Sequence, residues 1–158
     1  MVRKATLILI KHCPFPGLRR LFWKILFGYS IHPKAKVGRC YINVKELVIG
    51  EGAVLRSGNL ISCQRFFMAE HSRINGGNVF RGSGNFSLGA YSRVINNHFF
   101  DLTANVTIGE RSWVAGMNSQ FWTHGSFKSP SGQIKEKSIS ISNHVYLASG
   151  VKIGPGVS

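Results

Sequence analysis

A seven-residue phrase recurs from residue 31 onward, and this repeat limits the possible fold more than any other feature of the sequence. Each copy runs aliphatic, small, turn residue, any, small, any, aliphatic. The copies begin at Ile31, Ile49, Met68, Leu88, Ile108 and Ile141. Successive starts lie 18, 19, 20, 20 and 33 residues apart, and a last half-copy begins at Ile153.

A repeat of about three times six residues is typical of the hexapeptide parallel β-helix, in which each coil has three short strands. The aliphatic residues point inward and stack on their counterparts in the next coil, and the small residues occupy the corners. We therefore predict an all-β fold, with a parallel β-helix of roughly 18-residue coils over residues 31–158. A β-sandwich would show hairpin turns, but no Asn-Gly or Asp-Gly turn flanked by alternating strands is present.

The uneven spacing of the copies predicts where the coils depart from regularity. Starts 19 or 20 residues apart indicate one or two extra residues that bulge outward. The interval of 33 predicts an external loop at about residues 125–138, and this stretch is polar and rich in turn residues. The chain stops at Ser158, inside a coil, so we expect a C-terminal truncation of the solenoid, because solenoids need caps.

A second column of polar residues follows the same register. Asn59, Asn78, His98 and Asn118 come ten residues after the starts at Ile49, Met68, Leu88 and Ile108. Asparagine tolerates left-handed backbone geometry at corners, and stacked amides hydrogen-bond between coils. His98 therefore has two interpretations, a corner residue or an active-site side chain, and the sequence leaves both open.

The first 30 residues form a basic, amphipathic segment that differs from the repeat. Ten Lys and Arg residues precede the first acidic residue, Glu46, and six of them lie in this segment. Residues 18–29 have apolar positions at helical spacing, with Arg20 and Lys24 on the opposite side. Such a helix either lies on an anionic membrane surface or caps the core of the β-helix, and the two interpretations are compatible. The apolar stretch at residues 5–10 is too short for a signal-peptide core or a spanning helix.

Among the six histidines, His124 has the position best suited to chemistry. It is the sixth of the seven residues Ser119–Gly125, directly before the predicted loop. A histidine placed where a regular coil meets a loop can line a cleft, and imidazole is the usual general base near neutral pH. We predict that His124 is a catalytic base.

Three segments resemble the hexapeptide-repeat acyltransferases, in particular the branch that O-acetylates sugars of surface polysaccharides and lipopolysaccharide. They are Asn97–Asp101, Ile108–Gly116 and Ser119–Gly125. The resemblance implies a left-handed β-helix, a homotrimer with clefts between subunits, and acetyl-CoA as co-substrate. It also implies that His124 removes the proton from a sugar hydroxyl, and that His98 and Asp101 belong to the catalytic site. Asp101 either orients an imidazole, holds a sugar hydroxyl, or is a corner carboxylate that accepts backbone N–H groups.

The same resemblance assigns the remaining site residues. Coenzyme A is expected along the last coils, at Ala148, Ser149, Gly150 and Lys152, and the acceptor at Trp122 and Asn118. The acceptor is expected to be a sugar or a lipid-linked glycan, and no metal is expected. The predicted location is the cytoplasm, in peripheral contact with an anionic membrane at its inner face. Cys13, Cys40 and Cys63 include no Cys-x-x-Cys pair, which favours reduced thiols in such a compartment.

Two alternatives from other classes are weaker. A zinc enzyme of the γ-carbonic-anhydrase kind would need three histidines converging between subunits, for which His98, His124 and His144 are the candidates. That family's close histidine pair with a four-residue gap is absent. A basic scaffold that binds membrane or nucleic acid is permitted by the net charge of +14. From residue 46 onward, however, ten basic residues stand against six acidic ones, so the net charge of this part is only +4. The sequence also contains no nucleic-acid recognition motif. We therefore expect no nucleic-acid partner.

Overall fold

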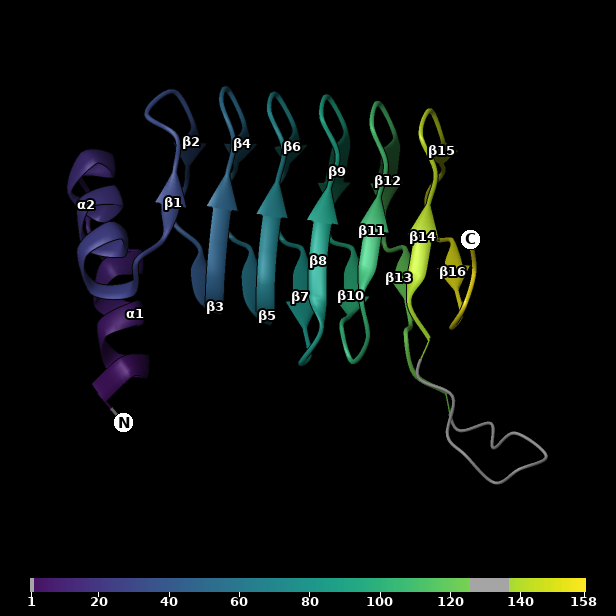
Figure 1. Ribbon diagram of the computed structural model, residues 1–158, viewed down its shortest axis with the longest axis horizontal. Helices are drawn as coiled ribbons and strands as arrows, with labels where there is room; N and C mark the ends of the chain where they lie inside the picture. Colours follow the sequence, from purple (N-terminus) through teal and green to yellow (C-terminus); the bar gives the residue numbers. More distant parts are fainter. Residues whose placement is uncertain (1, 126–136) are drawn as a thin grey trace.

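The chain forms a parallel β-solenoid of about five turns with two helices at its N-terminal end (Figure 1). The structure is a computed structural model that describes residues 2–125 and 137–158. All the strand pairs in this part of the chain are parallel, and each strand pairs with its equivalent in the next coil. The predicted parallel β-helix is therefore confirmed, whereas its left-handed winding stays a prediction.

The strands stack in three rows along the solenoid. One row consists of β2 (Lys36–Val37), β4 (Val54–Leu55), β6 (Arg73–Ile74), β9 (Arg93–Asn96), β12 (Trp113–Met117) and β15 (Tyr146–Leu147). A second row contains β1 (Ser30–Ile31), β8 (Asn85–Leu88), β11 (Val106–Ile108) and β14 (Ile139–Ile141). A third row contains β7 (Val79–Arg81), β10 (Phe99–Asp101), β13 (Gln120–Phe121) and β16 (Lys152–Ile153). The nine-residue strands β3 (Tyr41–Ile49) and β5 (Leu60–Met68) contribute to both the second and third rows.

The register of the second row matches the sequence repeat at every copy. The first residues of the six copies pair in order, namely Ile31, Ile49, Met68, Leu88, Ile108 and Ile141. The coil length is about 20 residues rather than 18, because only the first interval has 18. The interval of 33 is confirmed by the pairing of Ile108 with Ile141. The predicted loop that fills it lies mostly outside the described residues.

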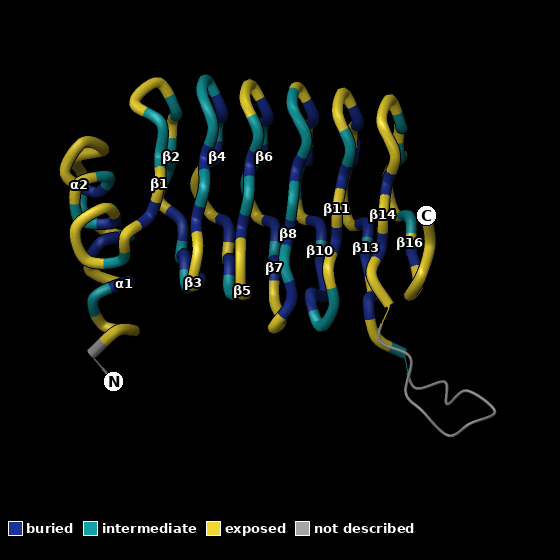
Figure 2. The backbone as a smooth tube through the Cα atoms, viewed as in Figure 1, coloured by how far each residue is buried: buried dark blue, intermediate teal, exposed yellow. Residues whose placement is uncertain are grey.

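Stacked phenylalanine rings fill the middle of the solenoid. Phe66, Phe80, Phe86, Phe100 and Phe121 have no solvent-exposed surface. The Phe100 ring lies 4.7 Å from Phe80, 5.3 Å from Phe86 and 4.4 Å from Phe121, measured between centroids. Figure 2 shows buried, dark blue segments that recur from coil to coil. The core is therefore a continuous column that fixes each coil against its neighbours.

The predicted amphipathic helix is confirmed as α2 (Pro16–Phe27), although its bounds differ from residues 18–29. Pro16 is the first residue of the helix, where a proline loses no intrahelical hydrogen bond. Gly28, in the left-handed region at φ 67°, ends it before Tyr29. Trp23 is buried against the core, so α2 caps the solenoid. Its apolar residues Leu18, Leu21, Ile25 and Leu26 remain exposed.

A second helix, α1 (Val2–His12), was not expected from the sequence. Leu7 and Ile10 are its buried apolar side chains, which is too few for a clear helical pattern. Arg3 anchors the helix to β3, because its guanidinium donates hydrogen bonds to Asn43 Oδ1 and to the Val44 carbonyl. Within residues 2–125 and 137–158, no helix has the length and apolar character needed to cross a membrane.

Candidate functional site

Asp101 and His124 lie side by side on neighbouring coils. Asp101 is the last residue of β10, and His124 follows β13 by three residues. Because β10 and β13 pair in parallel, with Phe100 opposite Phe121, the segments that leave the two strands also run together. His124 Nδ1 is 2.7 Å from Asp101 Oδ2. The structure therefore brings together two of the three residues predicted to be catalytic.

The Asp101 carboxylate is enclosed by hydrogen-bond donors. Its Oδ2 accepts the backbone N–H of Thr123 at 3.0 Å, that of His124 at 3.2 Å, and the Thr123 hydroxyl at 2.9 Å. Its Oδ1 accepts the Thr103 hydroxyl at 2.8 Å. Burial acts to raise the pKa of Asp101, but the hydrogen bonds from His124, Thr103 and Thr123 outweigh it and hold the pKa below its usual value.

The hydrogen bond to Asp101 determines which nitrogen of His124 is available for chemistry. An ionised carboxylate only accepts hydrogen bonds, so Nδ1 carries the proton and Nε2 keeps its free electron pair. The side chain of Asp101 is 8% exposed, whereas that of His124 is 49% exposed. A buried anion thus orients a solvent-accessible imidazole, an arrangement that supports proton abstraction by Nε2.

Aromatic side chains extend from the imidazole along the same row of strands. The Trp122 ring lies 6.0 Å from the His124 ring and 4.9 Å from the Phe99 ring. Trp122 Nε1 donates a hydrogen bond to Gln120 Oε1 at 3.1 Å, which fixes the indole. Trp122 is 36% exposed. The predicted substrate contact Trp122 therefore lies next to His124, and an aromatic surface of this kind suits the apolar face of a sugar.

His98 lies in the corner column and not beside Asp101 and His124. Its backbone N–H donates to Asn78 Oδ1, and its Nδ1 accepts the backbone N–H of Ser119 at 3.1 Å. It thus continues the amide ladder that Asn59 and Asn78 begin. The residue is 1% exposed, and no hydrogen bond joins it to the other two candidates among the described residues. This geometry favours the corner interpretation, and a catalytic role for His98 stays a prediction without support from its position.

Burial lowers the pKa of His98 to about 4. The carbonyls of Gly116 and Val114 partly oppose this shift, although Nε2 forms no hydrogen bond of acceptable geometry. The neutral ring is thus favoured in the folded state. As the pH falls, histidine is protonated first in the unfolded chain, where its pKa has the ordinary value of about 6.5.

Stability is expected to fall as the pH is lowered from about 6.5 towards 4, by about 3 kcal/mol in all from this group. Above pH 6.5 the ring is neutral in both the folded and the unfolded state, so it does not make the free energy of unfolding depend on pH. The variant His98→Asn places in this coil the residue that the two preceding coils use. Urea unfolding at several pH values is expected to show a weaker pH dependence for His98→Asn than for the parent, and equal slopes would contradict the assignment.

The predicted position of Asn118 in the corner column is wrong. Ser119 follows His98 in the column instead. Its N–H donates to His98 Nδ1, and the pairing of Phe99 with Gln120 places Ser119 opposite His98. The register shifts by one residue between Val114 and Met117, where β12 is irregular. Asn118 is exposed, has φ 63°, and donates its N–H to the Asn97 carbonyl. Its predicted contact with substrate remains untested.

The residues predicted to hold coenzyme A lie on the last described coil. Ala148, Ser149, Gly150 and Lys152 are all exposed. Ser149 Oγ accepts the Met117 N–H at 3.2 Å, and Gly150 donates its N–H to the Met117 carbonyl at 2.9 Å. Lys152 pairs with Gln120 in the strand register. These residues are small and open to solvent, with one cation beside the strand that leads to His124.

The histidines proposed for zinc do not meet within the chain. In the part of the chain that the structure describes, no group of three or more His, Cys, Asp or Glu side chains is arranged to hold a metal ion. His98 is buried in the corner column, and His144 lies exposed at a corner with φ 59°. The described residues therefore give the zinc enzyme no support.

Sequence reasoning missed the two threonines that complete the site. Thr123 is fully buried, donates its hydroxyl proton to Asp101, and accepts the Ala104 N–H at 2.9 Å. The hydroxyl of Thr103 bonds to Asp101 and lies 3.4 Å from His124 Nδ1. The available signal was positional, since Thr103 follows Asp101 by two residues and Thr123 precedes His124 directly.

Comparison with known proteins identifies no relative of this chain. Scans of the chain against family models, curated proteins and solved structures found no match.

Proposed function

We propose that this protein is an acetyl-CoA-dependent O-acetyltransferase that acts on a sugar hydroxyl of a surface-polysaccharide or lipopolysaccharide precursor. The observation that carries the proposal is the pairing of buried Asp101 with exposed His124 at 2.7 Å. It supplies an imidazole whose Nε2 is free to accept a proton. The aromatic surface of Trp122 beside it supports a sugar as the acceptor.

In the proposed reaction, Nε2 of His124 is the base. The sugar hydroxyl gives its proton to Nε2 as its oxygen forms a bond to the thioester carbonyl carbon. The C–S bond then breaks, and the protonated imidazole returns the proton to the departing thiolate. During this step Asp101 stabilises the positive charge on His124, and the four hydrogen bonds from the threonines and the backbone hold the carboxylate in place.

The binding sites for the two substrates are part of the same proposal. Acetyl-CoA supplies the acetyl group, and the small exposed run at residues 148–150 leaves room for its pantetheine arm. Lys152 would meet a phosphate. We infer a homotrimer, in which a neighbouring subunit would form the other wall of the cleft. Light scattering of the purified chain tests that state directly.

The proposed location is the inner face of a membrane. The exposed apolar side chains of α2, with Arg20 and Lys24, support peripheral contact with anionic lipid. Such a location would bring the site close to lipid-linked glycans. Sedimentation of the chain with anionic vesicles measures this contact separately from the chemistry.

The activity is tested by release of free thiol from acetyl-CoA. The chain is incubated with acetyl-CoA and a panel of nucleotide sugars and lipid-linked glycans, and the products are examined by mass spectrometry for an added acetyl group. Thiol release that depends on one class of acceptor is expected. Release that does not depend on any acceptor, or no release with the whole panel, would contradict the proposal.

Replacing Asp101 by asparagine tests the positioning role of the carboxylate. The amide has the same shape but no charge, so the protonated imidazole loses its counter-charge in the transition state. We expect kcat to fall by up to about 10⁴-fold with little change in KM for acetyl-CoA. Glu110→Gln removes one negative charge from an exposed position and is the matched control. A fall in kcat that is equal in both variants would contradict a specific role for Asp101.

A further inference from the structure

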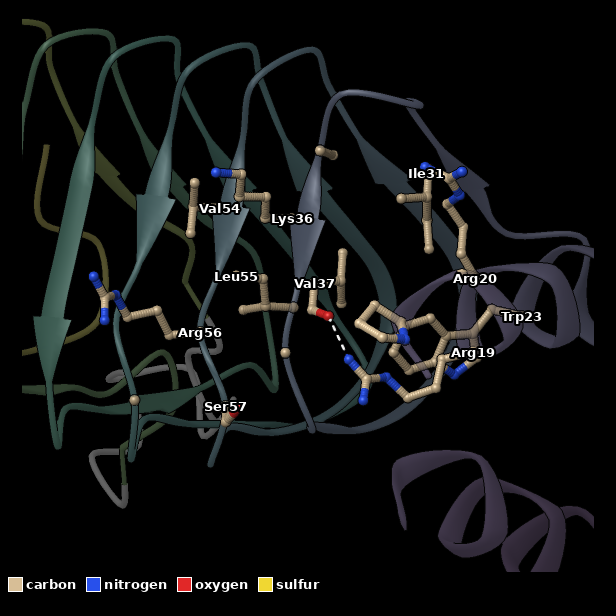
Figure 3. A pocket seen from close by; sticks show the side chains of 15 residues that line it. Arg19, Arg20, Trp23, Ile31, Lys36, Val37, Val54, Leu55, Arg56 and Ser57 are labelled. Carbon is tan, nitrogen blue, oxygen red and sulfur yellow. Dashed lines mark hydrogen bonds between the residues drawn. The ribbon is translucent and has the colours of Figure 1, made fainter. Parts of the chain in front are cut away.

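A cavity of about 820 Å³ lies between α2 and the first coils. Figure 3 shows Arg19, Arg20 and Trp23 on α2, with Val37, Leu55 and Arg56 on the strand side. The cavity lies at the helical, N-terminal end of the solenoid, whereas β10 and β13, which lead to the Asp101–His124 pair, lie towards the other end (Figure 1). The volume is in the range of ligand sites, and the proposed chemistry leaves the cavity unused.

Positive charge surrounds the cavity without a counter-charge. Four of the lining residues are cations, namely Arg19, Arg20, Lys36 and Arg56, and no lining residue is acidic. Arg19 is only 4% exposed. Its guanidinium donates to the carbonyls of Cys13 and Val37, both at 2.9 Å, and its Nε has no partner. A buried guanidinium that faces only carbonyls lacks the anion that normally offsets its desolvation.

The N-terminus of α2 reaches the same cavity and adds a second feature that favours an anion. Pro16 and Gly17, the first residues of the helix, belong to the lining. Phe15 at the N-cap position provides no side-chain hydrogen bond, and the first turn contains no acidic residue. Pro16 has no N–H, so the Gly17 amide and the helix dipole are what this end of α2 offers to a negatively charged group.

The rest of the lining is apolar, which distinguishes the site from one for free phosphate. Trp23, Ile31, Val37, Val54 and Leu55 form this surface. An inorganic anion would make no use of it, whereas a phosphate that carries an alkyl chain would contact both parts of the cavity. The exposed apolar residues on the outer side of α2 would place the opening near lipid.

We propose that this cavity binds one anionic phospholipid, with the phosphate among the four cations of the lining, beside the N-terminus of α2, and the acyl chains against Trp23, Val37 and Leu55. The inference extends the proposed membrane contact from a surface to a defined site. It does not depend on acetyl transfer, because the cavity and the Asp101–His124 pair lie on different coils.

The test uses dihexanoyl phosphatidic acid below its micelle concentration, with the intact chain and no vesicles. Isothermal titration is expected to show saturable binding with one lipid per chain. Arg56→Glu and Lys36→Glu alter exposed residues of the cavity wall, so the fold is expected to persist, and each is expected to weaken binding by about tenfold or more. Lys45→Glu changes the charge equally at an exposed position outside the cavity and is expected to leave the affinity unchanged.

Several results would overturn the proposal. Equal binding of inorganic phosphate would remove the role of the apolar surface, and equal binding of dihexanoyl glycerol would remove the role of the charges. An equal loss of affinity in Lys45→Glu would indicate a diffuse effect of net charge. If the lipid does not bind, and the mass of the assembly in solution falls when Arg56 is replaced, then a second copy of the chain occupies the cavity. A thiol-release assay on the same samples reports the proposed chemistry separately.

Discussion

Replacing His124 by alanine is expected to reduce acetyl transfer by about 10²- to 10⁴-fold, the usual contribution of a general base. A sugar hydroxyl is a weak acid, so its attack on a thioester depends on a base in contact with it. Nε2 of His124 is the atom in position to serve, since Nδ1 is held by Asp101 at 2.7 Å. The variant removes one of the five hydrogen bonds to the Asp101 carboxylate, so the free energy of unfolding is expected to fall by about 1–3 kcal/mol.

The measurement is the initial rate of thiol release with saturating acetyl-CoA and the acceptor that the panel identifies. His12→Ala, which removes an exposed histidine from α1, is the matched control and is expected to retain full activity. Thermal unfolding of both variants shows whether the fold is intact. Unchanged turnover in a folded His124→Ala protein would exclude His124 as the base and, with it, the proposed mechanism.

The sequence repeat predicted the coils because the aliphatic residue that begins each copy stacks on its counterpart in the next coil. Ile31, Ile49 and Met68 are spaced by nearly one coil, and each stacks on the next in the structure. Such a pattern is local and repeated, so a small irregularity in one coil does not hide it. Helix α1 lacks this redundancy. It has two buried apolar residues and depends on Arg3, whose partners Asn43 and Val44 are distant in sequence.

The sequence predicted the site residues that stand out by their position in the repeat or by a family pattern. His124 was identified by its position before the long interval, and Asp101 by its resemblance to a family pattern. The hydrogen bonds of Thr103 and Thr123 to Asp101 join different coils, so no spacing within one coil reveals them. The misplacement of Asn118 has the same origin, because the irregularity in β12 moves the corner by one residue. Contacts between coils become visible only when the register is known residue by residue.

Phe100 is the core residue whose loss is expected to cost most. Its ring has no exposed surface and contacts the rings of Phe80, Phe86 and Phe121 at centroid distances of 4.4–5.3 Å. Through Phe80 and Phe121 it links the coil before it with the coil after it. In a solenoid, each coil is stabilised chiefly by its neighbours, so a cavity here weakens two interfaces at once.

Phe100→Ala is expected to lower the free energy of unfolding by about 3–5 kcal/mol, the usual cost of removing a buried phenyl ring. This is a large fraction of the stability of an ordinary domain. Phe99→Ala is the matched control, because the neighbouring ring on β10 points outward and is only partly buried. Urea unfolding followed by circular dichroism measures both variants, and Phe100→Leu is expected to lie between Phe100→Ala and the parent. Equal losses at Phe99 and Phe100 would show that the stacked column does not hold the coils together.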